Sequence, residues 1–247
     1  MPSSAIGAAV VLVILVCYLL SLVLKNKIKL VSRAYSRGKD ERLRSQIANS
    51  LEEARPIHLD VGNACEGNLG GGSVLASMEA TEAVSSQMAY ADEPWAITGS
   101  AGSAAAFEKD AVQRGMENAD YAGSFDADCA AMTGISSFTH TAGNFASLEK
   151  EPAALHLSVG AFGPAAALND PLCSHGEVIC AAGDDPVTQA VSMLTADEVY
   201  VGEQVYEIPD SLRRAERKNA ALMTMDAARI AVVVVILIFT AAGLSGI

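Results

Sequence analysis

The stretch from Asp60 to Ser73 combines glycines with polar side chains in a pattern that could bind a ligand. Its sequence is DVGNACEGNLGGGS and it follows a short apolar run, so we expect a loop that leaves a strand and opens a helix. Backbone N–H groups at a helix start bind anions, and glycine lets a phosphate approach the backbone. This stretch is therefore a candidate binding site, with turn and packing glycines as the alternative interpretation.

The same stretch lacks the residues that nucleotide-binding motifs require. Gly67 and Gly72 have the spacing of a P-loop, but Ser73 follows directly where a lysine is needed. No lysine occurs anywhere from Asp40 to Glu108. The dinucleotide fingerprint also fails, because Leu75 stands where its third glycine belongs. We therefore expect no hydrolysis of ATP or GTP and no nucleotide cofactor.

Four of the predicted strands end in glycine-containing turns. In an open parallel sheet such turns converge along one edge, which is where ligands bind. The candidate ligand-binding residues at this edge are Asp60, Asn63, Gly70, Gly71, Gly72, Ser73, Ser100, Ser103, Gly160, Asp184 and Asp185. Their carboxylates would repel phosphate, which favours a metal, another cation or no ligand.

The histidines and cysteines do not match a metal-binding or catalytic motif. His58 and His156 alternate with apolar residues in predicted strands, which favours a structural role. Cys173 and Cys180 flank His175 at a spacing that does not suit zinc. The chain also lacks a Gly-x-Ser-x-Gly nucleophile elbow. We expect no metal site and no catalytic residue, and an enzyme with an acidic metal site is the least favoured alternative.

Short apolar runs alternate with alanine-rich helical stretches through the centre of the chain. Strands are expected at 56–61, 94–98, 129–134, 153–159, 177–182 and 199–205. A helix follows most of them, and the last one begins at Pro186 with Asp185 as its N-cap. This alternation predicts an α/β, Rossmann-like domain, with a mostly parallel five- or six-stranded sheet and helices on both faces.

A hydrophobic segment lies at each end of the chain. Ala5 to Leu24 is free of charge and long enough, at ~1.5 Å per residue, to cross the ~30 Å hydrocarbon core. The segment 227–247 has Arg229 as its one charged residue. We expect two transmembrane helices. A cleaved signal peptide is disfavoured for the first, because the region before it lacks a basic residue.

Charge is distributed unevenly around these segments. Eight basic residues lie between positions 25 and 44 and four between 213 and 218, whereas neither terminal tail has one. The positive-inside rule then places the centre in the cytoplasm and both termini outside a plasma or inner membrane. Between Leu51 and Asp210 the chain has 4 basic and 25 acidic residues, a net charge of about −21. Such a domain repels nucleic acid and favours cationic partners.

These features divide the chain into five parts. They are a transmembrane helix (1–24), a basic juxtamembrane helix or stalk (25–54), an acidic cytoplasmic α/β domain (55–210), a basic juxtamembrane segment (211–226) and a second transmembrane helix (227–247). The domains would repel one another unless opposite charge intervenes. The stalk, with Arg33, Arg37, Arg42 and Arg44, is the nearest source of it.

A succession of glycine motifs carries a resemblance to a known group of proteins. The motifs are Gly70-Gly71-Gly72, Thr98-Gly-Ser-Ala-Gly, Asp110-Ala-Val-Gln-Arg-Gly115, Val159-Gly-Ala-Phe-Gly-Pro164, Ala182-Gly-Asp-Asp-Pro186 and Val201-Gly-Glu-Gln-Val-Tyr206. From about Arg55 to its end, the chain resembles bacterial two-helix membrane proteins that carry a domain of unknown function. The resemblance implies this architecture and a bacterial membrane, and it supplies no catalytic residues.

A well-formed domain without catalytic motifs, tethered twice, favours a non-enzymatic function. We expect a membrane-anchored scaffold or accessory subunit that forms homo-oligomers or docks on a larger membrane protein complex. The alternative is a small-ligand or nucleotide sensor that uses the glycine-rich strand-to-helix turns.

Overall fold

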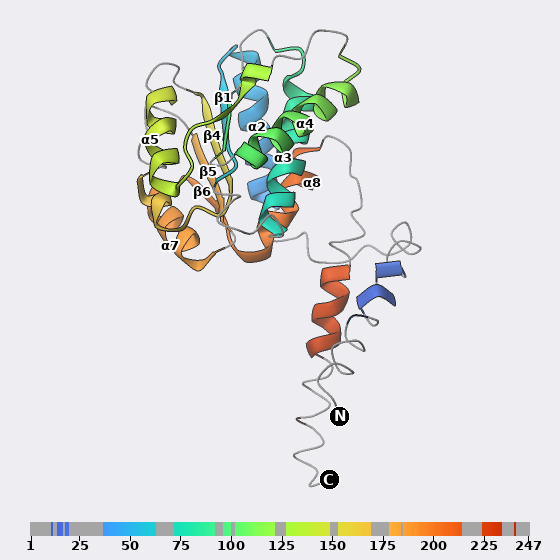
Figure 1. The fold of residues 1–247 in the computed structure, drawn as a ribbon. Helices are drawn as coiled ribbons and strands as arrows, with labels where there is room; N and C mark the ends of the chain where they lie inside the picture. The colour runs from blue at the N-terminus through green and yellow to red at the C-terminus, as the bar shows by residue number, and fades with distance from the viewer. Residues whose placement is uncertain are drawn as a thin grey trace. The chain divides into compact units, whose positions relative to one another are not determined.

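The computed structural model describes residues 11, 14–16, 18–19, 37–62, 72–91, 96–99, 102–121, 127–148, 153–168, 178–183, 185–213, 224–233 and 240. The chain forms two units: residues 38–214 fold into one domain (Figure 1), and residues 1–37 with 215–247 form the other. Residues 224–233 of the second unit are helical. None of the described helices combines the length and apolar character needed to cross a bilayer. Most of the two predicted spans lies outside the described residues, so both remain predictions.

The domain is built on one six-stranded sheet. Its strands are β1 (Ile57–Asp60), β2 (Ala96–Gly99), β3 (Ala130–Met132), β4 (Leu155–Gly160), β5 (Val178–Gly183) and β6 (Glu198–Tyr200). They lie in the order β3-β2-β1-β4-β5-β6, and each neighbouring pair is parallel. The predicted α/β fold with a parallel sheet is confirmed. The order reverses direction between β1 and β4, which is the switch point of a doubly wound sheet.

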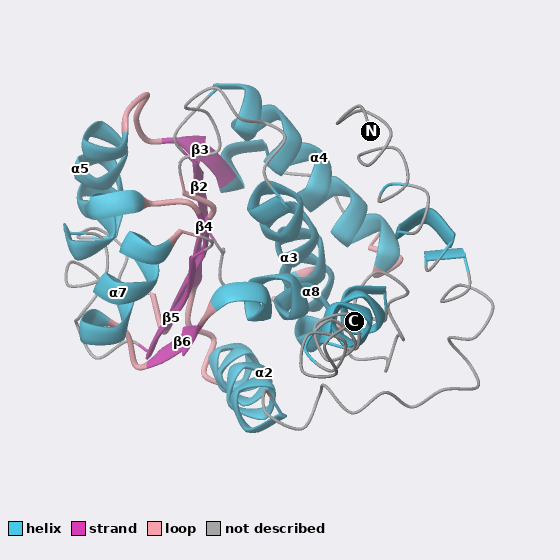
Figure 2. Cartoon of the chain, turned by 90° about the horizontal axis from the view of Figure 1, so that it is seen from below, coloured by secondary structure: helices cyan, strands magenta, loops and turns pink. Residues whose placement is uncertain are grey.

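Helices cover both faces of the sheet (Figure 2). One face carries α2 (Arg37–Glu52), α3 (Gly72–Met88), α4 (Gly102–Asn118) and α8 (Ile208–Leu212). The other face carries α5 (Ser137–Leu148) and α7 (Pro186–Thr195), and both of these helices pack on the short 3₁₀ helix η3 (Gly163–Ala165). The predicted N-cap of α7 is confirmed, because the Asp185 carboxylate accepts a hydrogen bond from the Thr188 N–H at 2.8 Å.

The face under α2, α3 and α8 holds the aliphatic core. Alternate residues of β1 and β4 point into it, since side chains of a strand alternate between its two faces. Leu59 and Leu157 are paired across the two strands and are fully buried there. The helices add Val84 from α3 and Leu212 from α8. This is the ordinary hydrophobic side of the domain.

Helix α2 belongs to this core, although its residues were expected to form a stalk outside the domain. Leu43 and Ile47 are buried among the core side chains. Arg42 bonds Glu198 at 3.1 Å, and Arg44 bonds the Ser211 carbonyl, so two basic residues expected to serve assembly are used inside the domain. The apolar residues of α2 are spaced to bury one helix face, and burying that face stabilises the fold more than exposing it. The stretch left for a stalk is 25–36, which lies outside the described residues.

Candidate functional site at the polar face of the sheet

The sheet presents polar side chains to the layer formed by α5 and α7. His58 and Asp60 on β1 alternate with the core residues of that strand, and His156 and Ser158 do the same on β4. Thr98 on β2 lies beside Asp60 in the register. All five residues are buried. A buried polar face is costly unless each group has a hydrogen-bond partner, so these five side chains form the candidate site.

Asp60 closes a ring of four hydrogen-bonded side chains with α5 and the segment before it. His140 Nε2 lies 2.9 Å from Asp60 Oδ1, and Asn144 Nδ2 donates to Asp60 Oδ2 at 2.7 Å. Thr133 completes the ring, with its Oγ1 2.6 Å from His140 Nδ1 and donating to Asn144 Oδ1 at 2.9 Å. The Gly62 N–H donates to Asp60 Oδ1 at 2.8 Å. His140 and Asn144 are one helical turn apart, which lets both donate to one carboxylate.

The direction of the hydrogen bonds in the ring indicates which of its side chains are charged. Thr133 gives its proton to Asn144, so it accepts from His140 Nδ1, while His140 Nε2 donates to Asp60; both ring nitrogens then carry hydrogen. Burial lowers the pKa of His140, but the Asp60 charge and hydrogen bond outweigh it and raise that pKa above its usual value. Burial also opposes ionisation of Asp60, yet His140 holds the pKa of that carboxyl well below its usual range. The ring is a buried ion pair.

His58 and His156 form a second pair next to the ring. Their rings stack with centroids 4.8 Å apart, and their Nδ1 atoms lie 2.7 Å from each other. The outer nitrogens bond Thr98 Oγ1 at 3.0 Å and Ser158 Oγ at 2.7 Å. Burial lowers the pKa of His58 to about 3 and that of His156 to about 4, so both are neutral at pH 7. The structural role expected for these two histidines fits this geometry, although the sequence gave no sign that they meet.

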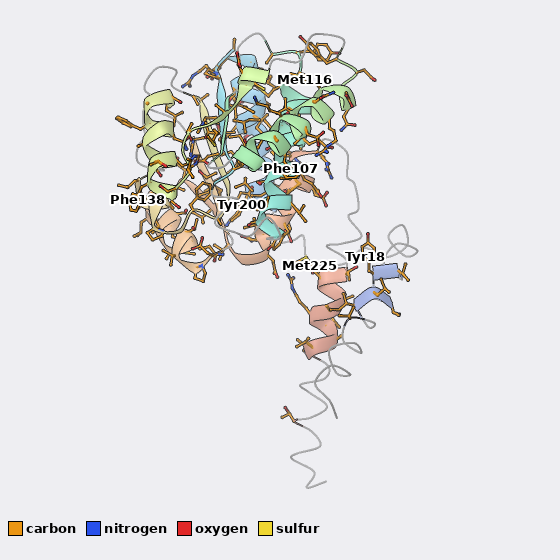
Figure 3. All side chains as sticks on the ribbon, viewed as in Figure 1. Tyr18, Phe107, Met116, Phe138, Tyr200 and Met225 are labelled. Carbon is orange, nitrogen blue, oxygen red and sulfur yellow. The ribbon has the colours of Figure 1, made fainter. Side chains whose placement is uncertain are left out.

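Helices α5 and α7 bury mainly polar residues and expose most of their large apolar ones. The buried residues of α5 are His140, Thr141, Asn144 and, at its end, Leu148, and those of α7 are Thr188 and Ser192. Large apolar side chains of α5, α7 and the segments next to α5 and η3 are exposed, and Phe138 lies on the outer side of α5 (Figure 3). They are Ile135, Phe138, Phe145, Leu168, Val187, Met193 and Leu194, with Leu194 88% exposed. We call these seven residues the α5–α7 face.

Glu108 is the one buried carboxyl group of α4. It is 1% exposed, and neither of its oxygens has a hydrogen-bond partner among the residues that the structure describes. The carboxyl lies over Gly99 at the end of β2, where a Cβ would come within 2.2 Å of Oε1. Burial raises the pKa of Glu108 to about 8, and the Asp60 charge adds to the shift while His140 opposes it. Glu108 is therefore protonated at neutral pH and lies close to the Asp60 ring.

The predicted ligand-binding residues at the carboxyl edge of the sheet have structural contacts where they are described. Gly160 adopts a positive φ, and a Cβ there would lie 2.5 Å from the Val61 carbonyl. A Cβ on Gly72 would lie 2.9 Å from the Tyr206 hydroxyl, and Ser73 is buried. Asp185 caps α7, as described above. Packing and capping therefore account for these four positions.

Other predicted site residues lie outside the described part of the chain. They are Asn63, Gly70, Gly71, Ser100 and Asp184; Ser103 falls in α4, but its side chain is not described. Glu108, Thr133, His140 and Asn144 were not among the site residues predicted from the sequence. The four-residue spacing of His140 and Asn144 was a usable signal that both face one partner, whereas nothing local distinguishes Glu108 from the other acidic residues of its helix.

In the described segments, no three side chains of the types that bind metals converge. Both nitrogens of His140 are used inside the ring, so this histidine has no atom left for a reacting substrate. No protein-family model matches the chain, and no curated protein or solved structure is significantly similar to it.

Proposed function

We propose that the protein is a membrane-anchored scaffold or accessory subunit whose domain assembles through the α5–α7 face. The observation that carries this proposal is the reversed polarity of the α5–α7 layer. A helix on the surface of a domain normally buries its apolar stripe. Here large apolar side chains of both helices are exposed, and exposed apolar surface that gathers on one face is typical of protein–protein contact sites.

The distribution of charge supports the same surface. The described segments 130–148, 153–168 and 186–196 contain no Asp, Glu, Lys or Arg, and Asp185 and Asp197 adjoin the last of them. The domain of residues 38–214 carries a net charge of about −18. Two such domains repel each other unless they meet where charge is absent. An uncharged face therefore gives association its lowest electrostatic cost.

A second copy of this chain is the occupant that the charges favour. Its own α5–α7 face is uncharged and apolar, so pairing the two faces around a two-fold axis leaves no charge buried without a partner. Phe138 and Phe145 supply exposed aromatic side chains of the kind enriched in the cores of interfaces, and Leu194 adds exposed apolar area. A larger membrane complex remains the alternative occupant.

The two predicted membrane anchors also support association of the domains. Ala5–Leu24 and 227–247 are the two apolar segments, and the basic clusters on the domain side of each favour a cytoplasmic domain. Two tethers confine the domains to one plane, which raises their effective concentration and allows a weak face-to-face contact to suffice.

Mass photometry of the full-length protein in mild detergent tests assembly. We expect wild type to form dimers or larger species, and Leu194→Asp to shift the population toward monomer by at least tenfold in dissociation constant, because a buried unpaired charge costs several kcal/mol. Leu75→Asp on α3 is the matched control, since Leu75 is also an exposed leucine and the added charge is the same. A monomer at every concentration, or equal dissociation in both variants, would overturn the proposal.

Ligand sensing is the second candidate, and the strand order favours it. A doubly wound sheet with the order 3-2-1-4-5-6 binds ligands at the carboxyl ends of its strands near the switch point. Calorimetry with Mg-ATP and Mg-GTP tests the nucleotide version. A dissociation constant in the low micromolar range that is lost in Gly72→Val would favour the sensor over the scaffold.

A further inference from the structure

Helix α5 is held on the sheet by polar contacts more than by apolar packing. Among its 12 residues, all of which are described, Leu148 is the one buried apolar side chain, and it packs in a small cluster with Ala153. The aliphatic core, as far as the structure describes it, includes no residue of α5, whereas α3 contributes Ala80, Val84 and Met88. Segments with few buried apolar contacts open at a lower free energy than the whole domain.

Asp60 connects α5 to the sheet. Its carboxylate accepts hydrogen bonds from His140 at 2.9 Å and from Asn144 at 2.7 Å. Thr133, which precedes the helix, is tied to β2, because its N–H donates to the Gly99 carbonyl at 3.1 Å. An isolated helix of 12 residues is marginal in water, so α5 loses most of its structure once it leaves Asp60.

Four ionisable side chains come together between α5 and the sheet. His58 and His156 stack on the same face as Asp60, and His140 reaches this cluster from α5. Asp60 and His140 are also the charged groups that act on the histidine pair. The described helices α7 and η3 contain no titratable side chain, and the residues of β2 and β5 in register with the pair are apolar. Removal of α5 therefore brings water to this cluster and changes how many protons it binds.

Glu108 is the other titratable group that acts on the ring. It belongs to α4, on the opposite face of the sheet (Figure 2), and packs on Gly99. Burial raises its pKa to about 8, so it is uncharged at and below neutral pH. Separation of α5 leaves α4 in place, so Glu108 stays covered.

We propose that α5 is a pH-controlled lid, which separates from the sheet when the histidine pair beneath it takes up protons, while the aliphatic side of the domain stays folded. The Nδ1 atoms of His58 and His156, 2.7 Å apart, can share one hydrogen, so protonation of both rings breaks this bond. Water that enters under α5 then solvates the two charges. Phe138 and Phe145 leave with the helix, so acid also removes part of the α5–α7 face; this consequence, unlike the separation itself, rests on the proposed function.

The proton balance makes opening depend on pH in two directions. In the closed domain the pKa values of His58 and His156 are about 3 and about 4, and solvation returns them toward 6.5. The open state then binds more protons below pH 6.5, so acid favours opening. Asp60 raises the pKa of His140 above 6.5 in the closed state, so the open state binds fewer protons above pH 6.5, and opening increases again. The lid should be closed most firmly near pH 6.5.

Native-state hydrogen exchange of the full-length protein in mild detergent tests the lid, with mass spectrometry at pH 5.0, 6.5 and 8.0. Protection is the intrinsic exchange rate at each pH divided by the measured rate. We expect peptides of α5 to lose protection about tenfold or more from pH 6.5 to 5.0, and to lose it again toward pH 8.0. Their exchange should respond less to urea than that of α3, because opening of the lid exposes less surface than global unfolding. The same profile in Leu194→Asp would exclude burial of α5 between two copies as its cause.

His156→Gln tests whether the histidine pair is the proton sensor. Glutamine can still bond Ser158 but takes up no proton, so the loss of protection at pH 5.0 should be at least threefold smaller. The loss at pH 8.0, which depends on His140, is the internal control and should remain. Equal urea and pH responses of α5 and α3, constant protection of α5 between pH 6.5 and 5.0, or an unchanged acid loss in His156→Gln would each overturn the proposal. The wild-type profile decides it if the variant does not fold, and a wild type that is always monomeric would overturn the scaffold function but not the lid.

Discussion

The two faces of the sheet bury side chains of opposite polarity. On the face under α3 and α8, the strands present Leu59 and Leu157 to other aliphatic side chains. On the face under α5 and α7, the same strands present His58 and Asp60, which are stabilised by hydrogen bonds and by an ion pair. The first face gains stability from the removal of apolar area from water, and the second from specific geometry.

This difference extends to the outer surfaces of the two layers. Because α5 and α7 use their polar residues to satisfy the sheet, their apolar residues are left outside. Helix α3 places Val84 in the core and keeps Glu79 exposed. Because α5 and α7 bury polar residues against the sheet, their outer surface is apolar. This half of the domain therefore has both an exposed apolar surface and buried ionisable groups.

Removal of Asp60 should produce the largest loss of stability. Asp60→Ala leaves His140 as a buried cation and Asn144 without its acceptor, which costs about 3–5 kcal/mol. Urea unfolding at pH 7 measures the loss, and Asp110→Ala, at an exposed ion pair of α4, should cost less than about 1 kcal/mol. Equal effects in the two variants would mean that the ring contributes no more than a surface pair.

A cavity on the aliphatic face should cost nearly as much but respond differently to pH. Leu157→Ala should lose about 2–5 kcal/mol, because the fully buried side chain leaves a void. The loss should stay constant as pH falls below 4. The Asp60→Ala loss should stay constant above pH 4 and shrink below it, because the stability from the ionised carboxyl is lost between the unfolded pKa of 3.8 and the lowered pKa of folded Asp60. Parallel pH profiles would remove the distinction between the two faces.

The histidine pair should make the domain sensitive to mild acid. His58 and His156 stay neutral in the folded state, with pKa values of about 3 and 4, but gain protons below pH 6.5 when unfolded. The unfolded chain then binds more protons, so the contribution of this pair to stability falls as pH drops from 6.5 toward 4, by up to about 3 kcal/mol per histidine. His156→Gln should flatten this part of the profile in urea unfolding, and an unchanged slope would exclude the pair as its source.

Substitution on the α5–α7 face should have the smallest effect on the fold. Leu194→Ser alters a side chain that is 88% exposed, so unfolding of the dissociated monomer should change by less than about 0.5 kcal/mol. The test is urea unfolding at a concentration where wild type and variant are both monomeric. A loss above 1 kcal/mol would show that Leu194 packs within its own domain.

The sequence predicted the sheet and most helices because their signals are local. Apolar runs mark the strands, and Asp185 with Pro186 marks the start of α7. The Asp60 ring was missed because its partners are distant in the chain: His140 lies 80 residues away. Helical periodicity locates an apolar stripe but does not say which side of the helix is buried, so the reversed polarity of α5 and α7 could not be predicted.

The N-terminal boundary of the domain could not be predicted from local sequence signals either. Leu43 and Ile47 have helical spacing, but the sequence does not reveal whether their helix stands alone or packs on a sheet. The basic residues around them suggested a stalk. In the structure, Lys39 bonds the Val199 carbonyl, which ties this helix to β6.

Cysteine labelling in native membranes tests most directly whether the α5–α7 face is covered. Leu194→Cys and Leu75→Cys place thiols on exposed positions of the two layers, and peptide mass spectrometry reports each site separately from the native cysteines. We expect the thiol at position 194 to react with a maleimide at least tenfold more slowly in membranes than after dilution into detergent, while the thiol at position 75 reacts at one rate in both. Equal, fast labelling of both positions in membranes would contradict the account.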